Sequence, residues 1–158
     1  MKKELTVTYE EFDSADELDY LDSYLLECAV EASKKSYSPY SGFKVGSALV
    51  LDNGNIYTGC NQENMAFSPT ICGERVAMFN AASNSDSPIK SIAIYCSSDR
   101  YTVTEPGAPC GVCRQVMSEF EMRYNQKIRI ILKGETGKIT IFDGVENLLP
   151  FAFSGLKI

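Results

Sequence analysis

The chain has 158 residues, of which 44% are hydrophobic and 23% are charged. These proportions are typical of soluble globular proteins, so they argue against a disordered or low-complexity chain and favour a single domain over residues 1–158. The 15 basic and 21 acidic residues give a net charge of −6 without a concentrated basic stretch, which argues against nucleic acid as a partner. No apolar run approaches the roughly 20 residues that span a bilayer, so we expect a cytoplasmic protein with no membrane partner.

The first predicted helix follows a charged segment, residues 1–13, which gives no structural prediction and is treated as an N-terminal extension of unknown role. Ser14 can cap this helix, and Glu17 lies three residues later, as in a capping box. Apolar residues then recur at helical spacing and predict a buried helix face, made of Leu18, Leu21, Leu25, Cys28, Ala29 and Ala32.

Five strands and two more helices are predicted further along the chain. Residues 43–51 and 56–60 are predicted to form a hairpin around the Asn53-Gly54 turn. A helix then begins near Ile71 or Cys72, followed by a strand at 89–95, a helix at 110–124, and strands at 128–132 and 138–142. A hairpin followed by alternating helices and strands predicts a three-layer α/β/α sandwich around a mixed five-stranded sheet.

Histidine is absent from the chain, whereas there are six cysteines. The absence of histidine excludes catalytic triads that use an imidazole base and zinc sites that use a His ligand. Because no signal peptide is recognisable, the cysteines favour metal binding or redox chemistry over a disulfide framework. Their spacing has to decide between these two.

Three cysteines lie at the predicted starts of two helices, in the segments Thr70-Ile71-Cys72-Gly73-Glu74-Arg75 and Ala108-Pro109-Cys110-Gly111-Val112-Cys113-Arg114-Gln115. Helix N-termini carry unpaired N–H groups and a partial positive charge, and both favour thiolates. We therefore predict that Cys72, Cys110 and Cys113 bind one Zn²⁺ per chain. Three ligands leave the fourth tetrahedral position open to water, and such a metal makes hydroxide available near neutral pH.

Two residues close to Cys72 are candidates for completing this centre. Glu74 lies two residues after Cys72 in the same helical turn, where a carboxylate can reach the bound water without being a ligand, so we predict that it carries the proton. Three thiolates around Zn²⁺ sum to −1, which makes the bound water less acidic. Arg75 is predicted either to hydrogen-bond the thiolates and offset this charge or to form an ordinary surface ion pair.

The order Cys-x-Glu followed by Pro-Cys-x-x-Cys matches the signature of zinc deaminases, with Cys in place of His. At these residues the chain resembles the small, free-standing cytidine deaminases, over a region from about Tyr37 to Phe153. The similarity also includes the segments Phe43-Lys44-Val45-Gly46-Ser47-Ala48, Thr58-Gly59-Cys60-Asn61-Gln62-Glu63-Asn64 and Leu148-Leu149-Pro150.

This resemblance implies a cytidine deaminase-like fold and the hydrolytic deamination of cytidine and deoxycytidine to uridine and deoxyuridine, a step of pyrimidine salvage. It implies that Asn61 and Glu63 bind the ribose hydroxyls and that Phe43 packs on the pyrimidine. Gly73, where family members commonly have Ala, is also expected among the substrate-binding residues. Phe153 matches a residue that the family donates from a neighbouring subunit of a homotetramer.

Simpler interpretations stand beside these roles. Phe43 and Phe153 can be core aromatics, and Asn61 and Glu63 can form a polar turn. Of the remaining charged residues, Arg100 is expected to be merely solvated.

Two alternative functions stay open for the whole chain. The first is a deaminase of a modified cytosine nucleoside such as blasticidin S. The second is a non-enzymatic zinc protein in which Cys60 or Cys96 closes the fourth metal position. Otherwise Cys28, Cys60 and Cys96 are expected to be small buried apolar residues.

Overall fold

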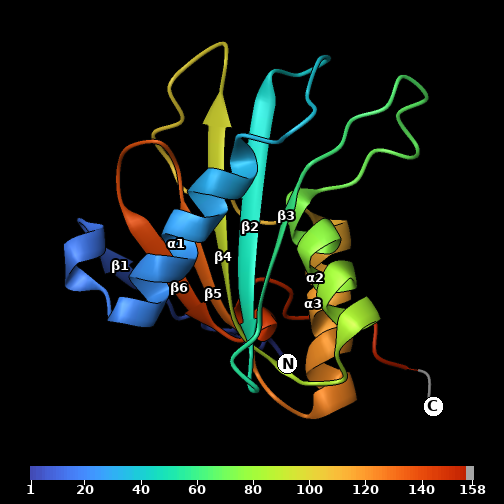
Figure 1. Cartoon of the computed structure of the whole chain (residues 1–158). Coiled ribbons are helices and arrows are strands. Elements are labelled where there is room, and N and C mark those ends of the chain that lie inside the picture. The colour runs from blue at the N-terminus through green and yellow to red at the C-terminus, as the bar shows by residue number, and fades with distance from the viewer. Residues whose placement is uncertain (156–158) are drawn as a thin grey trace.

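In the computed structural model, which describes residues 1–155, one mixed sheet organises the chain (Figure 1). Its strand order is β1-β6-β5-β4-β2-β3. The β4–β5 pair is parallel, and the other neighbouring pairs among residues 1–155 are antiparallel. The strands are β1 (Glu10–Phe12), β2 (Phe43–Leu51), β3 (Ile56–Cys60), β4 (Ile89–Ser98), β5 (Arg129–Lys133) and β6 (Ile139–Asp143).

The central strands are apolar on both faces, which is why they are covered by helices on both sides. In β2, Leu49 and Leu51 join one hydrophobic cluster, whereas Ala48 and Val50 join the other. Successive side chains of a strand point to opposite faces, so a continuous apolar run requires two packed layers. The sheet therefore lies in the middle of a three-layer sandwich, as the sequence predicted.

Helix α1 (Tyr20–Ser33) covers one face of the sheet, and α2 (Gly73–Asn84) and α3 (Gly111–Tyr124) lie side by side on the other (Figure 1). Leu25, Leu26 and Ala29 of α1 are buried against one face, and Ala77, Met78 and Met117 from α2 and α3 against the other. Within residues 1–155, no helix has the length and apolar character needed to cross a membrane.

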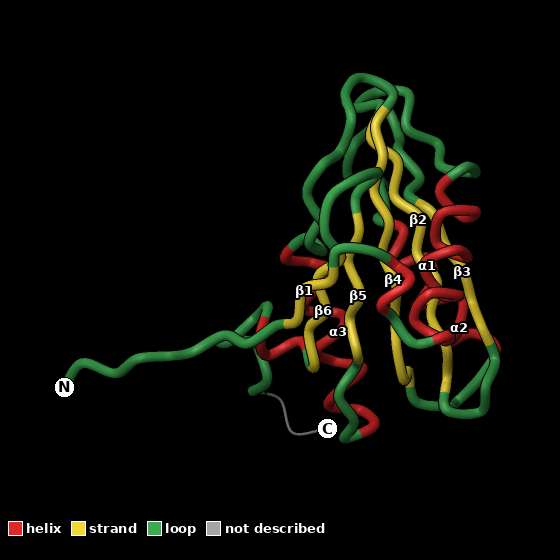
Figure 2. The backbone as a smooth tube through the Cα atoms, turned by 90° about the vertical axis from the view of Figure 1, so that its left-hand side faces the viewer, coloured by secondary structure: helices red, strands yellow, loops and turns green. Residues whose placement is uncertain are grey.

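The predicted five-stranded sheet is wrong by one strand, because the N-terminal extension contributes β1. Glu10–Phe12 pairs with β6, and Tyr9 packs its ring 5.6 Å from that of Phe142. The first residues of the chain, ahead of this contact, extend away from the sheet (Figure 2). A three-residue strand with two charged side chains carries no hydrophobic alternation of its own, so its pairing with β6 determines its conformation.

The predicted start of the first helix is also wrong. Ser14 and Glu17 do form a capping box, but it caps a single 3₁₀ turn, Ala15–Glu17. The chain is extended at Leu18, and Asp19 then caps α1 by accepting a hydrogen bond from the N–H of Asp22 at 2.9 Å. Two capping signals five residues apart therefore divide the region that the sequence predicted as one helix.

An ion pair that includes a buried carboxylate connects α1 to β5. Arg129 Nε donates to Asp22 Oδ2 at 2.8 Å, and the Asp22 side chain is only 3% exposed. Removing the cation leaves a buried carboxylate without its partner, so we expect Arg129→Met to lower the free energy of unfolding by about 3 kcal/mol, measured by urea denaturation. The control is Arg123→Met, whose partner Asp86 is 84% exposed and whose loss should cost at most about 1 kcal/mol. Equal losses in the two variants would contradict this view of Asp22.

Candidate active site

The three cysteines of the zinc-binding signature lie together at the starts of α2 and α3. Cys72 is the N-cap of α2, Cys110 is the N-cap of α3, and Cys113 lies in the first turn of α3. Their sulfur atoms all lie within 4.8 Å of one another. The Sγ atom of Cys110 is 3.8 Å from that of Cys72 and 3.6 Å from that of Cys113.

This spacing fits a zinc ion. Tetrahedral Zn–S bonds of about 2.3 Å place two sulfur atoms about 3.8 Å apart. Among the described residues, no fourth His, Cys, Asp or Glu joins the cluster. The cluster therefore suits one zinc ion held by three thiolates, with one ligand position left for a small molecule.

The cysteines differ in acidity because they share hydrogen bonds. A hydrogen bond from the Cys113 thiol, with further help from Arg75, lowers the pKa of Cys72 to about 5. Acting as the donor to this thiolate raises the pKa of Cys113, and burial raises it further. A zinc ion bound by these residues would replace the shared proton and stabilise all three sulfur atoms as thiolates.

Cys96 does not close the fourth position. It is 3% exposed, burial raises the pKa of its thiol to about 12, and its sulfur atom is not part of the ligand cluster found among the described residues. Its sulfur atom lies instead against Gly107, where an added Cβ would approach it to 2.4 Å. The expectation that Cys96 is a buried apolar residue therefore agrees with its surroundings.

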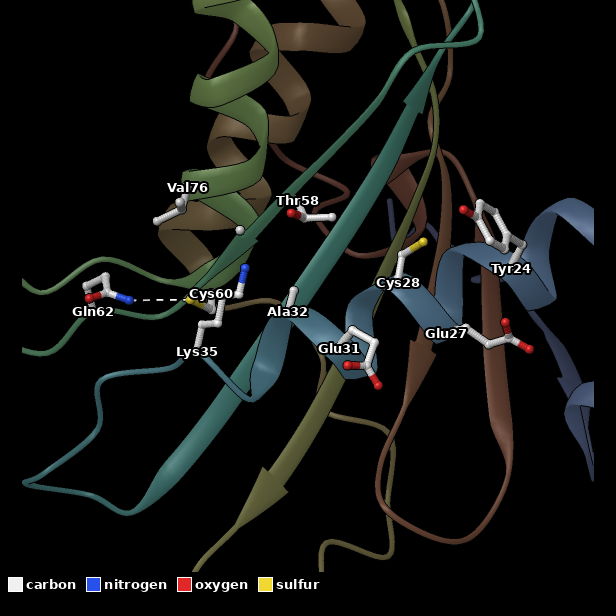
Figure 3. A pocket seen from close by; sticks show the side chains of 11 residues that line it. Tyr24, Glu27, Cys28, Glu31, Ala32, Lys35, Thr58, Cys60, Gln62 and Val76 are labelled. Atoms are coloured by element: carbon white, nitrogen blue, oxygen red, sulfur yellow. Dashed lines mark hydrogen bonds between the residues drawn. The ribbon is translucent and has the colours of Figure 1, made fainter.

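Cys28 and Cys60 are not buried, contrary to expectation. Both line an open groove of about 700 Å³ between α1, β3 and the start of α2 (Figure 3). The amide of Gln62 donates to Cys60 Sγ at 3.3 Å there. None of the three clustered cysteines lines this groove, so it is separate from the candidate metal site.

Glu74 is buried beside the cysteine cluster, in the first turn of α2. Its side chain is 4% exposed, and its Oε2 atom has no hydrogen-bond partner within residues 1–155. Burial raises the pKa of its carboxyl to about 7, and the negative charge of Cys72 adds to this effect. A carboxyl with a pKa near neutrality can both accept and return a proton, which is what general acid–base catalysis requires.

Arg75 faces the cysteines, one helical turn along from Cys72. Its Nη2 atom donates to Cys72 Sγ at 3.7 Å. Its Nε atom is buried without a partner in the described part of the chain. Of the two predicted roles of Arg75, the contact with the thiolates is the one that this geometry favours.

The side chain of Asn61 connects three segments next to the cluster. Its Oδ1 atom accepts from Ser36 Oγ and from the N–H of Val45, and its Nδ2 atom donates to the carbonyl of Phe43 at 2.9 Å. An amide has two N–H groups, so one donor remains for a ligand. Asn61 thus fixes the start of β2 and keeps one polar group available.

The Glu63 carboxylate is held by the turn before β2. Its Oε2 atom accepts from the N–H groups of Tyr40 at 2.9 Å and Ser41 at 3.2 Å, and its Oε1 atom accepts from Ser41 Oγ. Partial burial opposes ionisation, but these hydrogen bonds and the charge of Arg100 lower the pKa of Glu63 overall. A carboxylate has about four acceptor sites, so one on Oε1 is left to receive a hydroxyl.

Comparison with known proteins decides the family. A model of the cytidine and deoxycytidylate deaminase zinc-binding region matches residues 19–126. The chain belongs to the cytidine and deoxycytidylate deaminase family. The cytidine deaminase of Sporosarcina psychrophila is 41% identical over 124 residues, which cover 78% of this chain and 85% of that protein.

Solved structures of cytidine deaminases share the fold. The one from Burkholderia pseudomallei has a TM-score of 0.71 at 36% identity and covers 82% of this chain and 97% of its own. The one from Mycobacterium tuberculosis has a TM-score of 0.65 at 27% identity and covers 87% of this chain and 99% of its own. The cytidine deaminase-like sandwich and the zinc-binding character of the region are therefore confirmed.

The family resemblance also assigns substrate-binding roles to one residue in β2, Phe43, and one in α2, Gly73. Phe43 begins β2, is half-buried, and packs against the larger hydrophobic cluster. Gly73 is the first residue of α2, where an added Cβ would lie 2.8 Å from the carbonyl oxygen of Val45. The absence of a side chain lets the start of α2 approach β2 closely.

Phe153 is not a core residue of this deaminase chain. Its side chain is 68% exposed, and its backbone exchanges two hydrogen bonds with the amide of Gln115 on α3. The core alternative for Phe153 is therefore wrong. Because its backbone is bound to Gln115 of α3 and its ring is exposed, the Phe153 ring can contact a neighbouring molecule.

Arg100 is exposed, as expected of a solvated residue, but it also makes a specific contact. Its Nη2 atom donates to the carbonyl of Tyr40 at 2.6 Å. No sequence signal points to this contact, because the two residues lie 60 positions apart and the acceptor is a main-chain atom.

Proposed function

We propose that the chain catalyses the zinc-dependent hydrolytic deamination of cytidine and deoxycytidine to uridine and deoxyuridine. The observation that carries the proposal is the buried Glu74 carboxyl beside three clustered cysteines at two helix N-termini. Its family relatives include proteins named cytidine deaminase, and the chain covers 85% of one of them.

Cys72, Cys110 and Cys113 would hold the zinc ion, and Arg75 would offset part of their charge. Zinc with three protein ligands supplies a water that ionises near neutral pH. Glu74 takes a proton from the attacking water and delivers protons to N3 of the cytosine and to the leaving amino nitrogen. The water oxygen becomes bonded to C4, and ammonia leaves, so the reaction consumes one water and needs no other reactant.

The substrate-binding residues are assigned by position. Asn61 has a free N–H and Glu63 a free acceptor site, which together suit the two hydroxyls of a ribose. Phe43 would pack on the pyrimidine, and Gly73 would leave room for it beside Glu74. A net charge of −6 suits a free nucleoside better than a nucleic acid.

An ultraviolet assay tests the proposal. The zinc-loaded chain should convert cytidine and deoxycytidine to their uracil counterparts with release of one ammonia each. Turnover of blasticidin S without turnover of either nucleoside would establish the modified-nucleoside alternative. A zinc-loaded chain that turns over none of the three compounds would overturn the assignment as an enzyme of this kind.

We also propose that the protein is a cytoplasmic homotetramer that acts in pyrimidine salvage, and that Phe153 completes the site of a neighbouring subunit. If each site needs its own Glu74 and a neighbour's Phe153, mixed oligomers of Glu74→Gln and Phe153→Ala chains should be more active than the sum of the two separate variants. In a hybrid pair, the Phe153→Ala chain keeps Glu74 and receives an intact Phe153, so one site becomes complete. The activity is measured after co-expression or joint refolding with zinc.

The control replaces Phe153→Ala by Phe151→Ala in the same mixing experiment, since Phe151 is also exposed. Hybrids of Glu74→Gln with Phe151→Ala should show no activity beyond the contribution of their Phe151→Ala chains. Strictly additive activity in a verified hybrid with Phe153→Ala, itself impaired, would mean that Phe153 acts within its own chain.

A further inference from the structure

One peptide group lies between a cation and the candidate ribose-binding carboxylate. The carbonyl of Tyr40 accepts from Arg100 Nη2 at 2.6 Å. The N–H of the same peptide group, that of Ser41, donates to Glu63 Oε2 at 3.2 Å. Arg100, the Tyr40–Ser41 peptide group and Glu63 therefore form a continuous chain from a positive to a negative charge.

The turn between Ser38 and Phe43 is shaped to receive the arginine. Gly42 has a φ of +68°, and its carbonyl accepts from the N–H of Asp99 at 2.9 Å, which joins the turn to the end of β4. The Arg100 side chain lies over Gly42, where an added Cβ would be 3.2 Å from Nε and 3.3 Å from Cγ. Glycine thus supplies both the left-handed backbone and the space that the arginine stem fills.

The two hydrogen bonds of one peptide group reinforce each other. A cation on the carbonyl polarises the peptide and makes its N–H a stronger donor, here to a carboxylate. The charge of Arg100 also favours the ionised form of Glu63 directly. Beyond this direct effect of its charge, Arg100 contacts the turn and not the carboxylate, so it also acts on Glu63 by fixing the position of the Tyr40–Ser41 peptide group.

We propose that Arg100 is a positioning residue of the ribose site, which fixes the Tyr40–Ser41 peptide group and thereby presents Glu63 to the sugar hydroxyls. The role of Glu63 in this inference rests on the proposed function, whereas the contact between Arg100 and the turn does not. Arg100 itself need not touch the substrate. Its side chain is exposed, so its replacement should not disturb the hydrophobic core.

The test compares Arg100→Met with Arg100→Lys. Met keeps an unbranched stem over Gly42 but loses the charge and the donor, so KM for cytidine should rise roughly tenfold while kcat changes less than about twofold. Lys keeps a charge and a donor and should recover most of this loss. The inhibition constant of 2′,3′-dideoxycytidine, which lacks both hydroxyls, should stay within about twofold in either variant.

A second readout needs no turnover. The amide proton of Ser41 should exchange with solvent several times faster in Arg100→Met than in the natural chain, whereas the matched surface variant Arg123→Met should leave both Ser41 exchange and KM unchanged. Equal weakening of cytidine and dideoxycytidine would make Arg100 a general structural residue and overturn the proposal. Unchanged Ser41 exchange and unchanged KM would also overturn it. If the natural chain fails to deaminate cytidine, the proposed function fails, and the exchange of Ser41 still tests the contact with Arg100.

Discussion

Replacing Glu74 by Gln should leave about one zinc per chain and lower kcat for cytidine by roughly 10³-fold, within the range that general acid–base catalysis contributes. Gln has nearly the same shape, so it fits the buried position, but it cannot take a proton from water. The Oε2 atom of Glu74 has no partner among residues 1–155, so the amide should not break a hydrogen bond that holds α2 in place. Zinc is measured by metal analysis and the rate by the ultraviolet assay.

A matched substitution separates this effect from a general loss of charge. Glu119→Gln removes a carboxylate from an exposed position of α3 and should leave zinc content and kcat unchanged. Full activity in Glu74→Gln would show that another group moves the proton. Loss of zinc in Glu74→Gln would mean that Glu74 supports the metal instead of the chemistry.

Replacing Cys110 by Ala should reduce zinc to well below one per chain, abolish deamination and lower the melting temperature. Cys110 Sγ lies 3.8 Å from Cys72 Sγ and 3.6 Å from Cys113 Sγ, and its loss leaves two ligands that are held on different helices. Metal binding contributes to folding because the ligands are assembled only in the folded state. A chelator should therefore lower the melting temperature of the natural chain and have little effect on that of Cys110→Ala.

Cys28→Ala is the matched control, because Cys28 lies in the groove of Figure 3 and outside the cluster. It should keep a full zinc complement and the natural response to the chelator. If Cys110→Ala retained one zinc per chain, Cys110 would not be a ligand. In that case a different residue would complete the zinc site, and the ligand position left for a small molecule would lie elsewhere.

The central part of the fold could be predicted because its signals are local. The Asn53-Gly54 turn and the apolar runs beside it specify the β2–β3 hairpin, and both strands have the predicted bounds, Phe43–Leu51 and Ile56–Cys60. The cysteine spacing likewise carried the zinc prediction, since helix starts and ligands coincide in sequence. By contrast, β1 depends on pairing with β6, some 130 residues later, and no local pattern of Glu10–Phe12 reveals it.

The site was predicted less completely than the metal ligands. Sequence patterns identify residue types, but they do not show which acceptors remain free. The family resemblance assigned Asn61 and Glu63 to the ribose. Only the structure shows that Asn61 uses most of its hydrogen-bonding capacity on the start of β2, and Glu63 on the turn before β2. The contact of Arg100 could not be predicted either, since its partner is a carbonyl oxygen and carbonyl oxygens occur at every residue.

The sheet order has a practical consequence for where this protein can be cut. The residues matched by the family model, 19–126, contain β2, β3 and β4 but none of β1, β5 and β6. A fragment trimmed to that match would lose half of the sheet and expose β4 along the edge where it pairs with β5. Bare strand edges of this kind promote association with other chains, so such a fragment should aggregate. The segment that the family model matches is therefore shorter than the segment that forms the complete sheet. Shortened versions of this protein should begin before Glu10 and continue past Asp143.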